Sequence, residues 1–176
     1  DLEIYTSLPI THISAYMLTA YEDTPLGMLV EKGLYNLPDE DLVYQMFLMI
    51  DQTLHNKGFK RYELSNWTKK GYECKHNLFY WTDVNFLGIG VSAWSYVDNE
   101  RFGNTKNINE YLENVEKDFK PVRFREVLDE KKKLEEKIFL GLRLKEGVDV
   151  DLIKKKDFLS ELVDEGYGDI KNGKFY

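Results

Sequence analysis

The stretch from Tyr62 to Tyr96 constrains the fold of this 176-residue chain more than any other. It is the least helix-like part of the sequence, and it holds all three tryptophans, the only cysteine and one of the three histidines. It also contains a run of small residues, Gly88-Ile89-Gly90-Val91-Ser92-Ala93. Aromatic faces, amides and glycines in one segment are typical of a pocket wall, but the loop-rich part of a hydrophobic core has a similar composition. Composition alone leaves both interpretations open.

The overall composition excludes several classes of protein. A hydrophobic content of 43% is enough to fill a core, and no apolar run approaches the roughly 20 residues that cross a bilayer. The formal charge of −7 argues against nucleic acid as a partner, because binding a polyanion relies on clustered Lys and Arg. A single cysteine excludes an internal disulfide framework and favours a reducing, cytoplasmic location. It also cannot hold an iron–sulfur cluster or a structural zinc ion by itself.

The chain begins with the pattern of a helix followed by a strand. Residues 1–8 predict the end of a helix that Pro9 breaks, and residues 11–18 predict a buried strand. This order is that of the second half of a βαβ unit. Thr24 and Pro25 then predict the N-cap and first position of a short helix.

A stronger helix is predicted between residues 37 and 57. Its acidic first turn suits the positive end of the helix dipole, and an apolar stripe is expected to pack on a sheet: Leu42, Met46, Met49, Ile50 and Leu54. Residues 59–65 alternate and predict the next strand. The aromatic stretch thus follows a helix and a strand, which is where α/β proteins place their functional loops.

Within and after the aromatic stretch the pattern is mixed. We expect a short helix or coil over 76–81, a glycine-spaced strand over 86–93, a return strand over 101–104, and a helix capped by Asn107.

The composition changes at Pro121, and we place a domain boundary there, between residues 1–120 and 121–176. Beyond it, the sequence predicts charge-rich helices over 127–144, 148–156 and 157–166. Asn172-Gly173 then predicts a hairpin, because both residues accept the positive φ of a tight turn. Three helices and a hairpin indicate a small helical, winged-helix-like domain. Winged helices often bind DNA, so a non-enzymatic nucleic-acid- or protein-binding module is the alternative function.

The residues that could act as ligands or catalytic groups are not equally strong candidates. His12 and His55 are interpreted as structural, since the three histidines have no metal-ligand spacing. His76 lies in the aromatic stretch, where it is expected to bond Glu63 or a ligand. Cys74 lacks the partners of an activated thiol. Gly88-Ile89-Gly90 lacks the third glycine and the helix of a dinucleotide-binding loop.

Three segments of the stretch match a family pattern. They are Tyr62-Glu63-Leu64-Ser65-Asn66-Trp67, then His76-Asn77-Leu78-Phe79-Tyr80-Trp81, then Leu87-Gly88-Ile89-Gly90-Val91-Ser92-Ala93. They resemble the oxygen-independent coproporphyrinogen III oxidase-like radical SAM proteins, and most of all the HemW-type haem chaperones. Flanking segments fit as well, so the resemblance spans nearly the whole chain: His12–Thr19, Thr24–Leu26, Asn104–Asn107 with Tyr111, and Leu140–Leu144 with Glu146–Val148.

The resemblance implies an α/β fold: the C-terminal part of an incomplete TIM-like radical SAM barrel with an extension, followed by the C-terminal helical domain of this family. It also implies a [4Fe-4S] cluster and S-adenosylmethionine in the parent protein, with haem or another tetrapyrrole as a further ligand. None of the cluster-binding Cys-x3-Cys-x2-Cys motif is in this sequence. We therefore expect this chain alone to bind no cofactor and to be inactive, with the N-terminal half of the barrel as its partner.

The same resemblance implies which residues line the cofactor or tetrapyrrole cavity. They are Thr19, Glu63, Asn66, His76, Asn77, Tyr80, Trp81, Gly88, Gly90, Ser92 and Trp94. Trp94 stands where the family pattern has a histidine, so an aromatic ring replaces a ligand or proton donor at this position. His76 is therefore the better candidate for a ligand. The expected function is that of a haem chaperone related to the coproporphyrinogen dehydrogenase-type oxidoreductases; the sequence does not separate the two roles.

Overall fold

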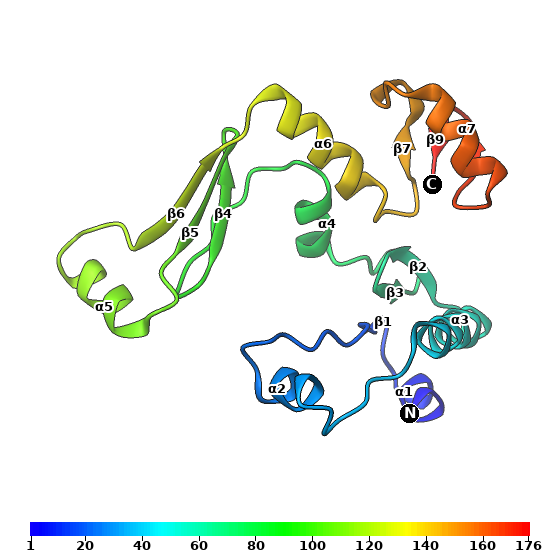
Figure 1. The fold of residues 1–176 in the computed structure, drawn as a ribbon, viewed down its shortest axis with the longest axis horizontal. Coiled ribbons are helices and arrows are strands. Elements are labelled where there is room, and N and C mark those ends of the chain that lie inside the picture. The colour runs from blue at the N-terminus through cyan, green and yellow to red at the C-terminus, as the bar shows by residue number, and fades with distance from the viewer. The chain divides into compact units, whose positions relative to one another are not determined.

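The computed structural model describes residues 1–176, which form two compact units, Asp1–Glu73 and Cys74–Tyr176 (Figure 1). None of the helices in either unit has both the length and the apolar character that a bilayer crossing requires.

The first unit has three helices, α1 (Leu2–Ser7), α2 (Pro25–Glu31) and α3 (Glu40–Asn56). Of these, α2 and α3 begin at a side-chain cap. The Thr24 side chain accepts a hydrogen bond from the backbone N–H of Gly27, and Pro25 occupies the first turn of α2, as predicted. Asp39 caps α3 in the same way by accepting from the N–H of Leu42 at 2.7 Å.

Three short antiparallel strands form the sheet of the first unit. In the order β1-β3-β2, strand β3 (Asn66–Thr68) lies between β1 (His12–Ser14) and β2 (Lys60–Glu63). The strand predicted over 59–65 is confirmed as β2, whereas the one predicted over 11–18 is shorter, since pairing with β3 ends at Ser14. The backbone of β2 leaves regular register between Arg61 and Glu63, where the chain turns into β3.

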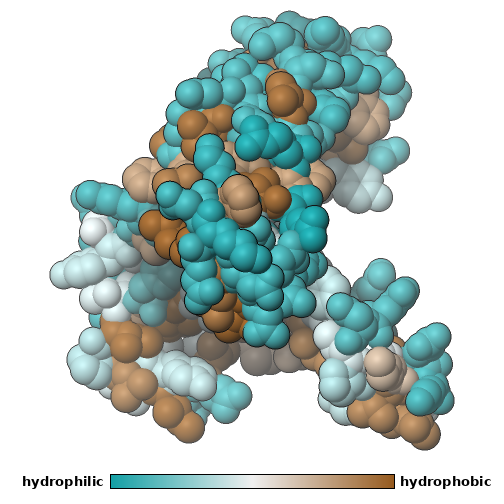
Figure 2. Space-filling model, turned by 90° about the vertical axis from the view of Figure 1, so that its left-hand side faces the viewer, coloured by the Kyte–Doolittle hydropathy of each residue, from teal (hydrophilic) through white to brown (hydrophobic).

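The core of the first unit is centred on Trp67, which contacts Leu54 and Phe59, all three at most 2% exposed. Helix α3 packs on this cluster through Phe47 and Ile50. The predicted stripe is therefore wrong for Leu42, Met46 and Met49, which are 46%, 49% and 62% exposed. The helix is rotated relative to the prediction, because Trp67 and Phe59 select the face that carries Phe47. Figure 2 shows apolar residues, in brown, at the molecular surface among hydrophilic ones.

The second unit begins with α4 (Lys75–Trp81), which leads to a meander of β4 (Trp94–Val97), β5 (Glu100–Asn104) and β6 (Val122–Val127) (Figure 1). The return strand predicted over 101–104 is confirmed as β5. The strand predicted over 86–93 is wrong: only Phe86 forms an isolated bridge, to Tyr96. Gly90 and Ser92 have positive φ values of 111° and 60°, which interrupt an extended strand.

The connection from β5 to β6 contains α5 (Ile108–Glu116), capped by Asn107 as predicted. Helix α6 (Glu130–Gly141) starts later than expected, because residues 122–127 pair with β5 instead of continuing the helix. A boundary after residue 120 would divide this sheet. The two-domain division at that position stays a prediction.

The chain ends in a small α/β module. It comprises β7 (Val148–Asp149), the single 3₁₀ turn η1 (Val150–Leu152), α7 (Lys156–Asp164), β8 (Ile170–Lys171) and β9 (Lys174–Phe175). The helix predicted over 148–156 is wrong, because Val148 pairs with Phe175 and joins a core with Leu159. The hairpin at Asn172-Gly173 is confirmed, and φ is positive at both residues. A winged-helix assignment of this module stays a prediction.

Candidate functional site

The predicted site residues of the first unit are engaged in structure. Glu63 and Asn66 are both 3% exposed. The Glu63 carboxylate accepts from the backbone N–H of Ser65 at 2.9 Å and from the Asn66 amide, and Asn66 in turn accepts from the Ser14 hydroxyl at 2.5 Å. This network links all three strands of the sheet. A buried carboxylate requires such donors, so the arrangement satisfies these groups without a ligand.

Thr19 and His12 lie on the same segment but in different surroundings. Thr19 is exposed in the loop that follows β1. His12 is held in β1, where its Nε2 lies 2.9 Å from the Tyr62 hydroxyl. His12 thus has the structural position that the sequence suggested, and a role of Thr19 at a cofactor stays a prediction.

In the second unit, α4 presents a histidine and a tyrosine one turn apart. His76 and Tyr80 are both exposed; their ring centroids are 4.9 Å apart, and the Tyr80 hydroxyl lies 3.1 Å from His76 Nε2. Tyr80 makes an edge contact with Phe86, and Phe86 packs on Tyr96. We call these four side chains the aromatic row. Asn77 is half-buried on the same helix.

Three members of the aromatic row, Tyr80, Phe86 and Tyr96, line a cavity of about 170 Å³ together with Phe79 and Arg101, whereas His76 lies outside it. At its inner end, burial raises the pKa of Tyr96 to about 12, and a hydrogen bond to the Asp83 carboxylate adds to the effect. The phenol therefore stays neutral throughout the physiological range. The cavity combines apolar rings with a few polar groups, as ligand sites do.

The glycine-spaced loop folds back on β4 and β5. The backbone N–H of Gly88 donates to the buried Ser95 hydroxyl at 3.0 Å, and a Cβ at Gly88 would lie 2.1 Å from the carbonyl oxygen of Trp94. Gly90 accepts from the Asn104 side chain at 2.9 Å. Ser92 donates its backbone N–H to Thr105 at 2.9 Å. The close approach of two backbones explains the glycine at position 88 without a ligand.

Trp94 lies on β4 opposite Gly103 of β5, and its ring covers that glycine. The ring also packs on Phe124 with centroids 5.1 Å apart, yet the side chain remains 45% exposed. Trp94 therefore stabilises the meander by covering a position that has no side chain of its own.

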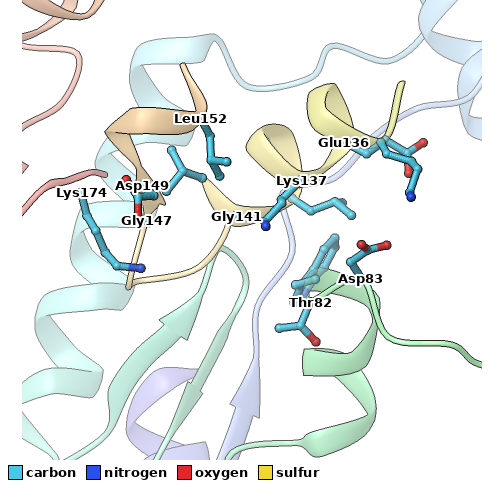
Figure 3. A pocket seen from close by; sticks show the side chains of 13 residues that line it. Thr82, Asp83, Glu136, Lys137, Gly141, Gly147, Asp149, Leu152 and Lys174 are labelled. Carbon is cyan, nitrogen blue, oxygen red and sulfur yellow. The ribbon is translucent and has the colours of Figure 1, made fainter. Parts of the chain in front are cut away.

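A larger cavity of about 360 Å³ lies between α4, α6 and the strands β7 and β9 (Figure 3). Trp81 is the one predicted site residue that lines it. The Arg143 guanidinium lies 4.7 Å above the Trp81 ring, a cation–π contact. The Trp81 indole N–H is buried and has no hydrogen-bond partner.

Sequence reasoning missed most of this cavity. Three elements that are separated along the chain contribute lining residues: Lys137, Leu140, Leu152 and Lys174. Each is unremarkable in its local sequence. The pairing of β7 with β9 and the close approach of Gly141 in α6 to Val148 in β7 bring them together.

No group of three or more His, Cys, Asp or Glu side chains in residues 1–176 is arranged to hold a metal ion. Cys74, the only cysteine, is half-buried at the N-cap of α4. The residues of this chain therefore do not fit a [4Fe-4S] cluster, which takes several thiolate ligands.

Comparison with curated proteins gives a consistent result, although no family model matches the chain. The chain is 35% identical over 159 residues to the haem chaperone HemW of Lactococcus lactis, covering 89% of this chain and 41% of that protein. It is 32% identical to HemW of Bacillus subtilis, covering 81% and 38%. It is 29% identical to the mitochondrial radical S-adenosyl methionine domain-containing protein 1 of Danio rerio, covering 78% and 33%. The chain thus spans between one third and about two fifths of the length of these relatives.

Comparison with solved structures shows the fold. The coproporphyrinogen III oxidase HemN from Escherichia coli, described as a radical SAM enzyme, matches with a TM-score of 0.73 at 14% identity, over 99% of this chain and 46% of that one. The mixed helix and strand content agrees with the predicted α/β class, and the incomplete barrel stays a prediction. The chain therefore belongs to the oxygen-independent coproporphyrinogen III oxidase-like radical SAM proteins of the HemW type, and it corresponds to their C-terminal portion.

Proposed function

We propose that this chain is the C-terminal portion of a haem chaperone and that its second unit contributes to binding haem as cargo. The observation that carries the proposal is the similarity to proteins named haem chaperone HemW, which covers most of this chain. The same similarity favours a role in haem metabolism over the alternative of a nucleic-acid-binding module.

Helix α4 offers the best-suited haem contact. His76 is exposed, so its imidazole can reach a planar ligand, and Phe79 and Tyr80 on the same helix are 45% and 40% exposed. Histidine is the most common protein ligand of haem iron, and exposed aromatic rings provide an apolar contact for the macrocycle. The Tyr80 hydroxyl near His76 Nε2 would orient the imidazole.

The radical SAM part of the parent protein belongs to the proposal as well. A [4Fe-4S] cluster with S-adenosylmethionine would supply radical chemistry when bound, but Cys74 is the only cysteine of these 176 residues. Cluster binding would therefore depend on a part of the protein outside them. Thr19, Glu63 and Asn66 remain proposed neighbours of that cofactor, and the glycine-spaced loop with Trp94 remains a proposed cavity wall. The single cysteine supports a cytoplasmic location.

Haem titration of the 176-residue chain tests the haem contact. We expect the Soret band to shift on binding and the affinity to fall at least about tenfold in His76→Ala, since an iron ligand is lost. His55→Ala is the matched control, because His55 is also exposed on a helix, in the last turn of α3. Equal affinities of wild type and His76→Ala would contradict the assignment of His76.

A further inference from the structure

We propose that the 360 Å³ cavity between α4, α6 and β7–β9 is a second binding site, for a small aromatic ligand that carries a single carboxylate. The site is separate from the exposed face of α4 that carries His76. The proposal goes beyond haem binding and does not depend on it. The polar groups around the cavity and its apolar floor support it.

Lysine side chains surround the cavity. Three of them line it, and Lys133 already pairs with Glu130 at 3.3 Å. Lys137 from α6 and Lys174 from β9 have neither an ion pair nor a hydrogen bond, and Figure 3 shows both side chains extending toward the same space. Two unpaired ammonium groups from different elements make a position suited to an anion.

The carboxylates at the cavity have partners already. Glu136 accepts from Arg101 at 2.5 Å, and Asp149 accepts from the backbone N–H of Asp151 at 3.0 Å. The third, Asp83, interacts with the Tyr96 hydroxyl and helps to raise its pKa. The groups left without partners at this cavity are therefore donors, so the ligand must supply acceptors.

The same three carboxylates limit the charge of the ligand. A doubly charged phosphate would meet Asp83, Glu136 and Asp149 at close range, and the C-terminal end of α4 adds partial negative charge. The C-terminal ends of α4 and α6 line the cavity with Trp81, Leu140 and Gly141, so neither helix presents the N-terminal N–H groups that bind phosphate there. A single carboxylate fits this balance best.

The floor of the cavity is apolar. Trp81, Leu140, Val148 and Leu152 line it, and Arg143 stacks on the Trp81 ring and fixes its plane. The buried indole N–H of Trp81 has no partner, which is unfavourable for a residue that serves packing alone. An aromatic ring wide enough to cover Trp81 would complete the site, and a volume of about 360 Å³ suits a small ligand.

NMR titration of the 176-residue chain tests the proposal. The probes are naphthoate, the neutral naphthalenemethanol and the doubly charged naphthyl phosphate, followed by the indole N–H resonances of the three tryptophans. Trp81→Phe assigns the Trp81 resonance. We expect naphthoate to shift that resonance most strongly and to bind about tenfold more tightly than the alcohol, owing to the charge-assisted hydrogen bonds.

Two double variants with equal charge change decide the role of the lysines. Lys137→Gln/Lys174→Gln is expected to reduce naphthoate affinity to that of the alcohol. Lys145→Gln/Lys154→Gln removes two exposed lysines elsewhere in the second unit and is expected to bind as wild type does. His76→Ala is also expected to bind naphthoate as wild type does, which separates this site from the haem contact.

Three results would overturn the proposal: equal loss in both double variants, tighter binding of the phosphate than of the carboxylate, or an unmoved Trp81 resonance at saturation.

Discussion

Trp67 and Trp81 come from the same aromatic stretch, yet they lie in opposite situations. Trp67 in the first unit is 1% exposed and donates its indole N–H to the Asp51 carboxylate at 2.7 Å. Trp81 in the second unit has its indole N–H buried without a partner, at the edge of a cavity. The first is a completed core position, and the second leaves a polar group for something else to satisfy.

The contrast between the two tryptophans distinguishes residues that stabilise the fold from residues available for binding. Around Trp67, every polar side chain that the prediction assigned to a ligand is used internally, as Glu63 and Asn66 illustrate. Around Trp81, the groups without a partner are donors: the indole N–H and the ammonium groups of Lys137 and Lys174. A complete hydrogen-bond network favours a structural role, and an incomplete one beside a cavity favours binding.

The largest expected effect is the loss of the Trp67 ring. Trp67→Ala should lower the free energy of unfolding by about 3–5 kcal/mol, because it leaves a cavity between Leu54 and Phe59. Urea denaturation measures the change. Trp94→Ala is the control: its ring is 45% exposed, so the loss should be clearly smaller. Equal losses would break the distinction between a core tryptophan and a surface one.

A smaller effect is expected when the indole N–H of Trp67 is left without an acceptor, as that of Trp81 is. Asp51→Ala removes the acceptor of the indole N–H and should cost about 1–3 kcal/mol, since a buried donor is left unsatisfied. Asp51→Asn retains an oxygen acceptor and should lose less. The ion pair of Asp51 with Arg61 is exposed, at 3.7 Å, and adds little to either value. The same urea denaturation measurement compares the two variants.

Tyr96 makes the stability of the second unit depend on pH in the alkaline range. Its folded-state pKa of about 12 lies above the ordinary value of 10.0, so the folded state holds the phenol proton more tightly. The stability from this proton is complete below pH 10.0 and is lost as pH rises through about 12. We expect the urea midpoint of wild type to fall more steeply in this window than that of Tyr96→Phe. Parallel curves would contradict the assignment.

The smallest expected effect is that of Trp81→Phe. The substitution removes an N–H that has no partner and keeps an aromatic ring under Arg143, so the free energy of unfolding should change by less than about 1 kcal/mol. Trp67→Phe, which removes a bonded N–H, should cost more. The reverse order of these two variants would show that Trp81 has a partner in solution.

Much of the local structure could be predicted from short-range rules. Thr24 and Asn107 cap helices, and Asn172-Gly173 forms a hairpin, because each feature depends on residues at most three positions apart. Predictions failed where distant partners decide. Helix α3 is rotated toward Trp67, and residues 148–149 form a strand because Phe175 offers a pairing edge.

The sequence by itself determined the family, the capped helices and the aromatic stretch that carries His76 and Trp81, since motifs and caps are read within a few residues. Only the tertiary structure decided which tryptophan is satisfied and which is not. Asp51 lies 16 positions before Trp67, and Lys137 and Lys174 lie far from Trp81 along the chain. Hydrogen-bond satisfaction and cavity lining depend on atoms that meet only after folding, so no local pattern encodes them.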